Sequence, residues 1–218
     1  MHVGYNFVTL QKYFRVMRLI FILLTALLPL SVIAQNVWEK PDVDEQEQNG
    51  TKPNPDAKYL AGAVPEVNGK IEWQLDVDVP GKSAAVIYDT MLKCLTDLTK
   101  TENQLEGGRV VLVNKNEHIV AANIREWMVF TDKLFVLDRT EFSYTLIAYC
   151  SDSHLKVTMN RISYRYEDEN YKAEEWISDG YALNRKKTKI YRGPAKFRRS
   201  TIDRKDYLFD VIRQTVLK

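Results

Sequence analysis

The stretch SHLKVTMNRISYRY, residues 153–166, decides the fold class. Its apolar side chains alternate with polar ones as far as Met159 and then continue in the opposite phase from Ile162 to Tyr166. Alternation with a period of two predicts a half-buried strand, and the change of phase at Asn160–Arg161 predicts a β-bulge that bends it. Because a long, bent strand needs curved neighbours, this stretch predicts a curved sheet.

Neighbouring runs complete the predicted sheet. Residues 109–113, 118–130 and 133–150 have strand-like patterns, and short links at 131–132 and 151–152 predict an antiparallel meander. Upstream, IEWQLDVDV at 71–79 alternates apolar with polar or acidic residues and predicts one more strand. Ser83 can cap the helix that follows, whose apolar positions 84, 87, 91, 95 and 98 share one face.

The C-terminal stretch, residues 171–217, predicts the helices that cover this sheet. We expect a short helix over 171–184, a break at Gly193–Pro194, and an amphipathic helix from Ser200, with Asp203 completing a capping-box-like start. The stripe of this last helix predicts that it fills the concave face of the sheet; its members are Ile202, Phe209, Ile212 and Val216. The order strand, helix, four-stranded meander, helix is an α+β, helix-grip or TBP-like plan over residues 58–218.

Several motifs carry a family resemblance. They are VPEVNGK (64–70), PGKS (80–83), TENQLE (101–106), REWMVF (125–130), RISYRYE (161–167), AEEWISDGYALNRKKTK (173–189) and YRGPAKFRRSTIDRKDYLF (191–209). With them the chain resembles a bacterial envelope family known as domain of unknown function 4468. The resemblance runs from about Ala57 to Phe209 and implies a TBP-like fold and an exported setting. It implies no catalytic residue.

Residues 1–34 predict an export signal. Arg15 and Arg18 precede an uncharged run from Leu19 to Ala34, which is the pattern of a secretory signal peptide cleaved after Ala34. A retained N-terminal membrane anchor is the alternative, but the run is shorter than the ~20 residues that a spanning helix needs. Met17 would give a more ordinary signal as the first residue. We therefore expect an exported protein, periplasmic or secreted.

The charge distribution narrows the possible partners. Of 31 basic and 29 acidic side chains, three basic ones and no acid lie in the first 34 residues, so the exported part is close to neutral. This balance argues against general polyanion binding, and nucleic acid is not expected as a partner. Residues 35–57 are rich in acids and proline and predict a disordered acidic linker between the signal and the domain.

Catalytic and metal-binding motifs do not appear in the sequence. His118 and His154 have no Cys or His neighbour at ligand spacing, so we expect neither a metal nor another cofactor. The two cysteines, Cys94 and Cys150, both face the predicted core. Export would allow a disulfide between them, but free buried thiols are the favoured interpretation.

A basic edge is one candidate binding surface. Its residues are Arg185, Lys186, Lys187, Lys189, Arg192, Lys196, Arg198 and Arg199. One interpretation is a solvated edge whose cations pair with acids at 167–169 and 174–175. The other is a dock for an envelope protein, an anionic lipid or a glycan, because Tyr and Phe are interleaved with the cations. In that case changing Arg198 and Arg199 to Glu should weaken binding without loss of folding.

These observations predict a non-catalytic binding or assembly module of the cell envelope. Its ligand would occupy the basic edge or a groove between the sheet and the last helix. An enzyme acting on envelope glycans or lipids through an unrecognised site is the alternative.

Overall fold

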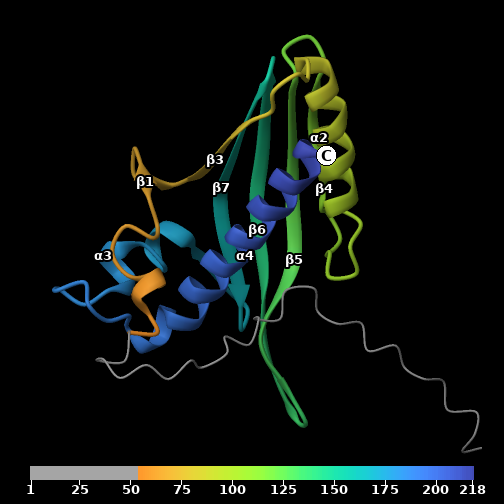
Figure 1. Ribbon diagram of the computed structural model, residues 1–218. Coiled ribbons are helices and arrows are strands. Elements are labelled where there is room, and N and C mark those ends of the chain that lie inside the picture. Colours follow the sequence, from red (N-terminus) through yellow and green to blue (C-terminus); the bar gives the residue numbers. More distant parts are fainter. Residues whose placement is uncertain (1–53) are drawn as a thin grey trace, which may run out of the picture. The chain divides into compact units, whose positions relative to one another are not determined.

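The structure, a computed structural model, describes residues 54–218 (Figure 1). The predicted signal peptide and most of the predicted linker lie outside these residues. In chain order the elements are η1 (Ala57–Tyr59), β1 (Glu66–Val67), β2 (Lys70–Ile71), β3 (Trp73–Asp78), α2 (Ala84–Leu98), β4 (Arg109–Asn114), β5 (Ile119–Lys133), β6 (Val136–Ser151), β7 (His154–Tyr166), β8 (Glu169–Lys172), η2 (Ala173–Glu175), α3 (Asp179–Ala182) and α4 (Arg192–Leu217).

The main sheet is antiparallel throughout, with strand order β3-β7-β6-β5-β4. The strand β8 pairs with the last part of β7, on the same edge as β3 but further along the strand. The predicted α+β plan, with a helix after the first long strand and a meander of four strands, is confirmed.

The predicted bulge is present in β7. Ser143 of β6 pairs with Ser163, whereas Thr145 pairs with Asn160, so β7 has an extra residue in this interval. Arg161 lies in the bulge and has a positive φ of 53°. The bulge lets Met159 and Ile162 face the same core although their separation is odd, which is the phase change seen in the sequence.

Two helices cover one face of the sheet. The helix α2 begins at the predicted cap, where the Ser83 side chain accepts a hydrogen bond from the backbone N–H of Val86. The long helix α4 crosses the same face beside α2 (Figure 1). Side chains from the sheet and both helices are almost fully buried between these layers; they include Met91, Leu95, Ile124, Leu146, Val157, Leu208, Ile212 and Val216. Burial of this apolar surface is the main stabilising contribution.

The start of α4 differs from the prediction. The helix begins at Arg192, eight residues before Ser200, and Gly193–Pro194 lies inside its first turn. Proline is accepted there because the N–H groups of the first turn have no intrahelical acceptor, so its missing N–H costs nothing. The predicted break at Gly193–Pro194 is therefore wrong.

The segment before α4 is also less helical than predicted. Residues 171–172 belong to β8, and only the short turns η2 and α3 occur between 173 and 182. Pairing of Tyr171 with Tyr164 competes with helix formation at the start of this segment. Within residues 54–218, none of the helices is both long and apolar enough to cross a membrane.

Candidate functional site

The predicted basic edge divides into an exposed loop and a helix. Arg185, Lys186, Lys187 and Lys189 are exposed in the loop between α3 and α4. The Asn184 side chain holds this loop by accepting hydrogen bonds from the backbone N–H groups of Thr188 (2.8 Å) and Lys189 (3.1 Å). The loop therefore presents four cations in a defined turn.

Arg198 is a structural residue rather than part of the edge. Its side chain is 0% exposed and donates to the backbone carbonyl oxygens of Tyr59 (2.6 Å), Leu60 (2.8 Å) and Ile177 (2.6 Å). It also pairs with Asp179 at 2.6 Å. A Glu at this position would put a carboxylate against three carbonyl oxygens, so the structure leads us to expect that the Arg198→Glu protein does not fold, contrary to the expectation from sequence.

Lys196 and Arg199 are half-buried and paired. The Arg199 guanidinium makes two hydrogen bonds to Asp56, at 2.7 and 2.8 Å, although Asp56 had been placed in the linker. Lys196 donates to Asp138 at 2.7 Å and to the Tyr166 hydroxyl at 2.8 Å. Burial alone would lower the pKa of Lys196, but these hydrogen bonds outweigh it and raise the pKa. Both side chains thus stay charged.

The acids at 167–169 and 174–175 are not the partners of these cations in the structure. The ion-pair partners of Lys196, Arg198 and Arg199 come from other segments: Asp138, Asp179 and Asp56. The solvated-edge interpretation therefore named the wrong ion-pair partners for these three cations, although Glu167 lines a surface hollow together with Lys196 and Arg199.

A buried ion pair on α4 was missed by the sequence analysis. Arg204 donates two hydrogen bonds to Glu126, at 2.9 and 2.6 Å, and Tyr144 donates a third at 2.9 Å. Burial and the Glu126 carboxylate raise the pKa of Tyr144 well above its usual value. A signal existed: Glu126 occupies an apolar phase of β5 between Ile124 and Met128, and an acid at such a position requires a partner.

An aromatic hollow lies beside the first turn of α4. Its volume is about 640 Å³, and four rings line it: Tyr166 of β7, Tyr171 of β8, Trp176 directly after η2, and Phe197 of α4. Tyr171 and Trp176 lie 4.5 Å apart between ring centroids, and the Phe197 ring meets those of Trp176 and Tyr166 edge-on. The indole N–H of Trp176 is buried and has no hydrogen-bond partner among residues 54–218.

Three cations of the predicted edge, Arg192, Lys196 and Arg199, line the same hollow together with one acid, Glu167. Arg192 is exposed, and within the described part of the chain it has no ion-pair partner. The N-cap residue of α4, Tyr191, makes no side-chain capping bond, so the positive end of the helix adds to the potential of this rim. Aromatic rings and cations that alternate along the sequence thus line the same hollow in the structure.

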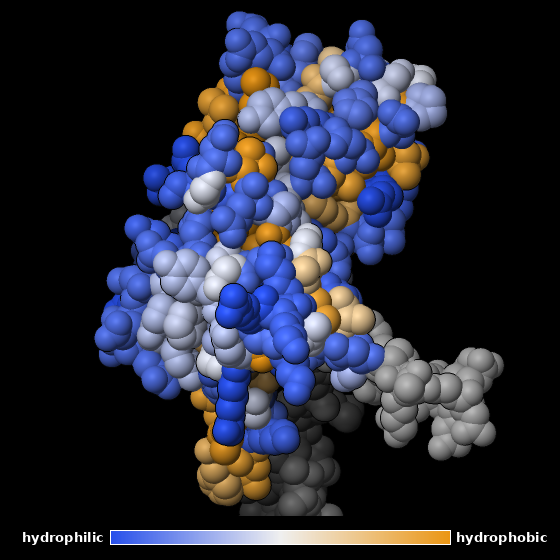
Figure 2. All heavy atoms as spheres, turned by 90° about the vertical axis from the view of Figure 1, so that its left-hand side faces the viewer, coloured by the Kyte–Doolittle hydropathy of each residue, from blue (hydrophilic) through white to orange (hydrophobic). Residues whose placement is uncertain are grey.

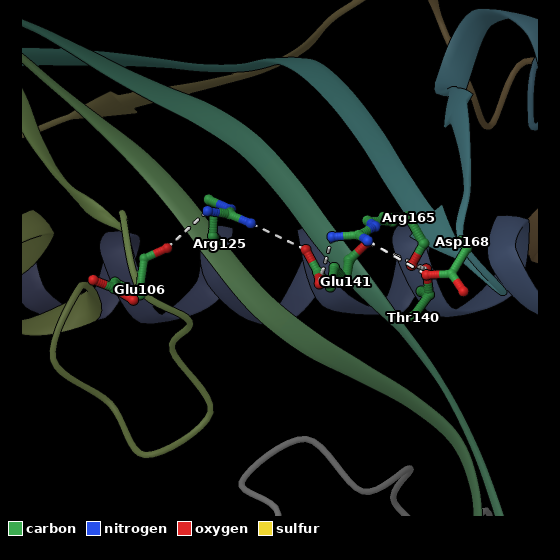
Figure 3. Close-up of polar contacts among 6 residues, drawn as sticks. All are labelled: Glu106, Arg125, Thr140, Glu141, Arg165 and Asp168. Atoms are coloured by element: carbon green, nitrogen blue, oxygen red, sulfur yellow. Dashed lines mark hydrogen bonds and ion pairs between the residues drawn. The ribbon is translucent and has the colours of Figure 1, made fainter.

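The uncovered face of the sheet carries a second charged cluster. A row of contacts crosses β5, β6 and β7: Arg125 pairs with Glu141 at 3.0 Å, and Arg165 lies 3.7 Å from Glu141 and 3.3 Å from Asp168 (Figure 3). Arg125 also donates to the Glu106 carbonyl oxygen. In Figure 3 the helix α4 lies behind the strands, so this row is on the opposite face. Its cations are paired with acids, which is typical of cross-strand stabilisation.

The remaining predicted residues lie elsewhere. Cys94 on α2 and Cys150 at the end of β6 are buried free thiols, and burial raises the pKa of Cys150 to about 12. His154 lies 3.3 Å from Asp76 and Asp78, and His118 packs edge-on against Tyr88. No group of three or more metal-ligating side chains occurs among the described residues.

The fold defines the chain as an α+β protein of the TBP-like class, and comparisons give the family. The model of a family described as a domain of unknown function (DUF4468) with TBP-like fold matches residues 73–165. A crystal structure of a DUF4468 family protein from Bacteroides ovatus is 40% identical, with a TM-score of 0.71, and the alignment covers 75% of this chain and 95% of that one. The chain belongs to the DUF4468 family.

A second solved structure supports the fold alone. It is a TBP-like protein from Parabacteroides distasonis, 20% identical with a TM-score of 0.58, and the alignment covers 71% of this chain and 97% of that one. A search of curated proteins finds no match. The family model ends at Arg165, so it does not include the aromatic rings of Tyr171, Trp176 and Phe197.

Proposed function

We propose that this protein is a non-catalytic binding module of the cell envelope, exported by its N-terminal signal, and that the aromatic hollow binds an anionic glycan. The observation that carries the proposal is the convergence of four aromatic rings and three cations, against one acid, Glu167, in one hollow. Its volume, about 640 Å³, lies in the usual range of ligand sites, roughly 300–1,000 Å³.

The chemistry of the hollow fits a sugar better than a bare anion. Trp and Tyr combine a large apolar face with a polar edge, and a sugar ring likewise has an apolar C–H face and a hydroxyl edge. This supports a carbohydrate that packs on the Tyr171–Trp176 pair.

The charge of the rim supports an acidic sugar. Lys196 and Arg199 each already contact one carboxylate, whereas Arg192 and the loop cations at 185–189 extend the positive potential toward solvent. A sugar carboxylate at Arg192 would form a charge-assisted hydrogen bond. Because the exported part is close to neutral overall, this attraction is local and depends on position.

The groove between the sheet and α4 is not favoured as the site. The side chains of Leu208, Ile212 and Val216 that face the sheet are fully buried, so the core occupies this space. A ligand there would have to displace close-packed side chains.

A short oligogalacturonide tests the proposal, with its methyl ester as the matched uncharged ligand. Titration calorimetry should show saturable binding of the acid and at least tenfold weaker binding of the ester. Arg192→Ser should weaken binding of the acid about tenfold, since one charge-assisted hydrogen bond is worth about 1.5 kcal/mol or more. Lys115→Ser is the control, because Lys115 is exposed at the β4–β5 turn. Equal binding of acid and ester, or unchanged binding by Arg192→Ser, contradicts the proposal.

An enzyme acting on envelope glycans or lipids is the second candidate, and one observation favours it. A hollow of about 390 Å³ beside the β7 bulge contains two carboxylates, Glu72 and Glu174. Both also support the fold: Glu72 accepts from the Asn160 amide at 2.9 Å, and Glu174 accepts from the Ile71 N–H at 3.2 Å. We propose that Glu72 and Glu174 have this structural role and are not catalytic. Release of reducing ends from oligogalacturonide by the wild type, lost in the Glu72→Gln protein, would favour the enzyme instead.

A further inference from the structure

The β5–β6 hairpin extends beyond the rest of the sheet. Pairing of β6 with β7 ends at Glu141 and Arg165, but pairing of β5 with β6 continues to Lys133 and Val136. Residues 131–138 therefore form a two-stranded ribbon without a third strand. Figure 1 shows this ribbon projecting below the other strands.

The end of this ribbon is apolar and exposed. Four consecutive side chains, here called the apolar tip, are exposed by 84% at Leu134, 96% at Phe135, 54% at Val136 and 57% at Leu137. Figure 2 shows the tip as a hydrophobic projection below a mostly hydrophilic surface. A run of exposed apolar residues lowers the solubility of a protein, so its presence indicates an interaction site.

The backbone of the tip gives a second, independent observation. Lys133 pairs with Val136, which leaves Leu134 and Phe135 as the two turn residues, and Phe135 has a φ of 67°. Glycine or asparagine normally occupies such a turn position, because a bulky side chain is disfavoured in the left-handed region. The turn therefore carries a large aromatic side chain at a site where the fold alone would favour a small residue.

We infer that the apolar tip inserts into the interfacial region of a lipid bilayer. A stable protein interface uses roughly 20–30 residues on each side, and a projecting tip of four side chains falls well short of that. A bilayer accepts a narrow convex tip because lipids rearrange around it. Charged residues adjoin the tip on both sides, Lys133 before it and Asp138 and Arg139 after it, so insertion would stop at a depth of about 5–10 Å.

The chain outside the described residues favours a membrane as the occupant. The predicted export run ends at Ala34 and the described domain begins at Asn54, so this connection can span at most ~70 Å. If the run is retained as an anchor, the domain remains within this distance of the bilayer.

This inference is independent of the glycan proposal. None of the four tip residues lines the aromatic hollow, although Asp138 at the base of the ribbon contacts Lys196. Failure of one proposal would therefore leave the other intact.

Fluorescence of a polarity-sensitive dye tests the inference on the full chain. Phe135→Cys is labelled with a nitrobenzoxadiazole dye under native conditions, where Cys94 and Cys150 are buried. The probe membrane is vesicles of equimolar phosphatidylethanolamine and phosphatidylglycerol. We expect a blue shift of the emission on adding vesicles and quenching by brominated acyl chains. Val113→Cys is the matched control, because Val113 is an apolar residue 56% exposed on β4, and its emission should not change.

Two results would overturn the inference. The first is water-like emission at position 135 in the presence of vesicles, whether or not the chain binds them through its N-terminal segment. The second is a blue shift without vesicles that grows with protein concentration, which would assign the tip to a contact between copies of this chain.

A substitution separates membrane contact from folding. Phe135→Gly should fold at least as stably as the wild type, because glycine adopts a positive φ without a steric cost. When Leu134→Ser is added, binding of the apolar tip to these vesicles should weaken on the order of 100-fold. The reason is that two large apolar side chains no longer transfer from water into the bilayer. The dye for this comparison is placed at Val136→Cys in both backgrounds. An unchanged blue shift in the doubly substituted protein would contradict insertion through the tip.

Discussion

Two parts of the same basic stretch have opposite environments. Arg185, Lys186 and Lys187 are exposed in a loop, whereas Arg198 and Arg204 are buried on α4 with every charge matched by an acid or by carbonyl oxygens. Both parts are rich in Lys and Arg, so the presence of these residues alone does not decide their role. Position on the helix does: Arg198 and Arg204 continue the buried stripe that contains Thr201 and Leu208.

The largest expected effect is the loss of the Arg198 contacts. Arg198→Met leaves the buried carbonyl oxygens of Tyr59 and Ile177 without this donor and removes one donor each from Leu60 and Asp179, which should lower the free energy of unfolding by at least about 4 kcal/mol. Urea denaturation followed by circular dichroism measures this. Arg198→Lys should recover only part of the loss, because one ammonium cannot reach all four acceptors. A Met variant within about 1 kcal/mol of the wild type would show that Arg198 is not a structural residue.

The buried pair of Arg204 and Glu126 should show strong coupling. Arg204→Met alone leaves the Glu126 carboxylate buried without its cation and should cost about 3–5 kcal/mol. The double variant Arg204→Met with Glu126→Gln should be more stable than the single variant. Additive losses in this double-mutant cycle, measured by urea denaturation, would mean that the two side chains do not depend on each other.

An alkaline loss of stability should involve Tyr59, which connects η1 to α4. Burial and the hydrogen bond to Asp203 raise the pKa of the Tyr59 hydroxyl from 10.0 to about 12. Because the folded state holds this proton more tightly than the unfolded state, its contribution is complete below pH 10.0 and is lost as the pH rises through about 12. As the pH rises across this range, the free energy of unfolding should fall less steeply for the Tyr59→Phe protein than for the wild type. Equal slopes would show that Tyr59 does not titrate as inferred.

The exposed cations should have the smallest effect on stability. Lys186→Ala and Lys187→Ala should each change the free energy of unfolding by less than about 0.5 kcal/mol, because both side chains are solvated. Lys187 tests this most severely, since it lies 3.8 Å from Asp179, the partner of Arg198. A loss above about 1 kcal/mol for Lys187→Ala would place the loop with the structural part of the stretch.

Local patterns predicted much of this fold. Ser83 predicted the start of α2 because a cap acts on N–H groups three residues away, and Asn160–Arg161 predicted the bulge because a phase change is visible within one strand. The start of α4 was misplaced because Gly193–Pro194 is compatible both with a break and with a first helical turn. Local sequence could not separate these two outcomes.

The candidate site depended on long-range contacts and was therefore predicted only in part. The cations Arg192, Lys196 and Arg199 were named from sequence, and they do line the hollow. Its floor was not predicted, because Tyr166, Trp176 and Phe197 come together only when β7, η2 and α4 pack. Arg198 was placed with the binding residues because its acceptors are backbone carbonyl oxygens, which no side-chain pattern reveals.

One measurement tests most directly whether some cations of the basic stretch stabilise the fold while others bind a ligand. It is the free energy of unfolding of the wild type and of Arg192→Ser, with and without oligogalacturonide at about 100 times the wild-type Kd. Without ligand the two proteins should agree within about 0.5 kcal/mol. With ligand the wild type should gain about 2.7 kcal/mol, and the variant about 1.3 kcal/mol less. Equal gains by both proteins, or a large difference between them without ligand, would contradict the account.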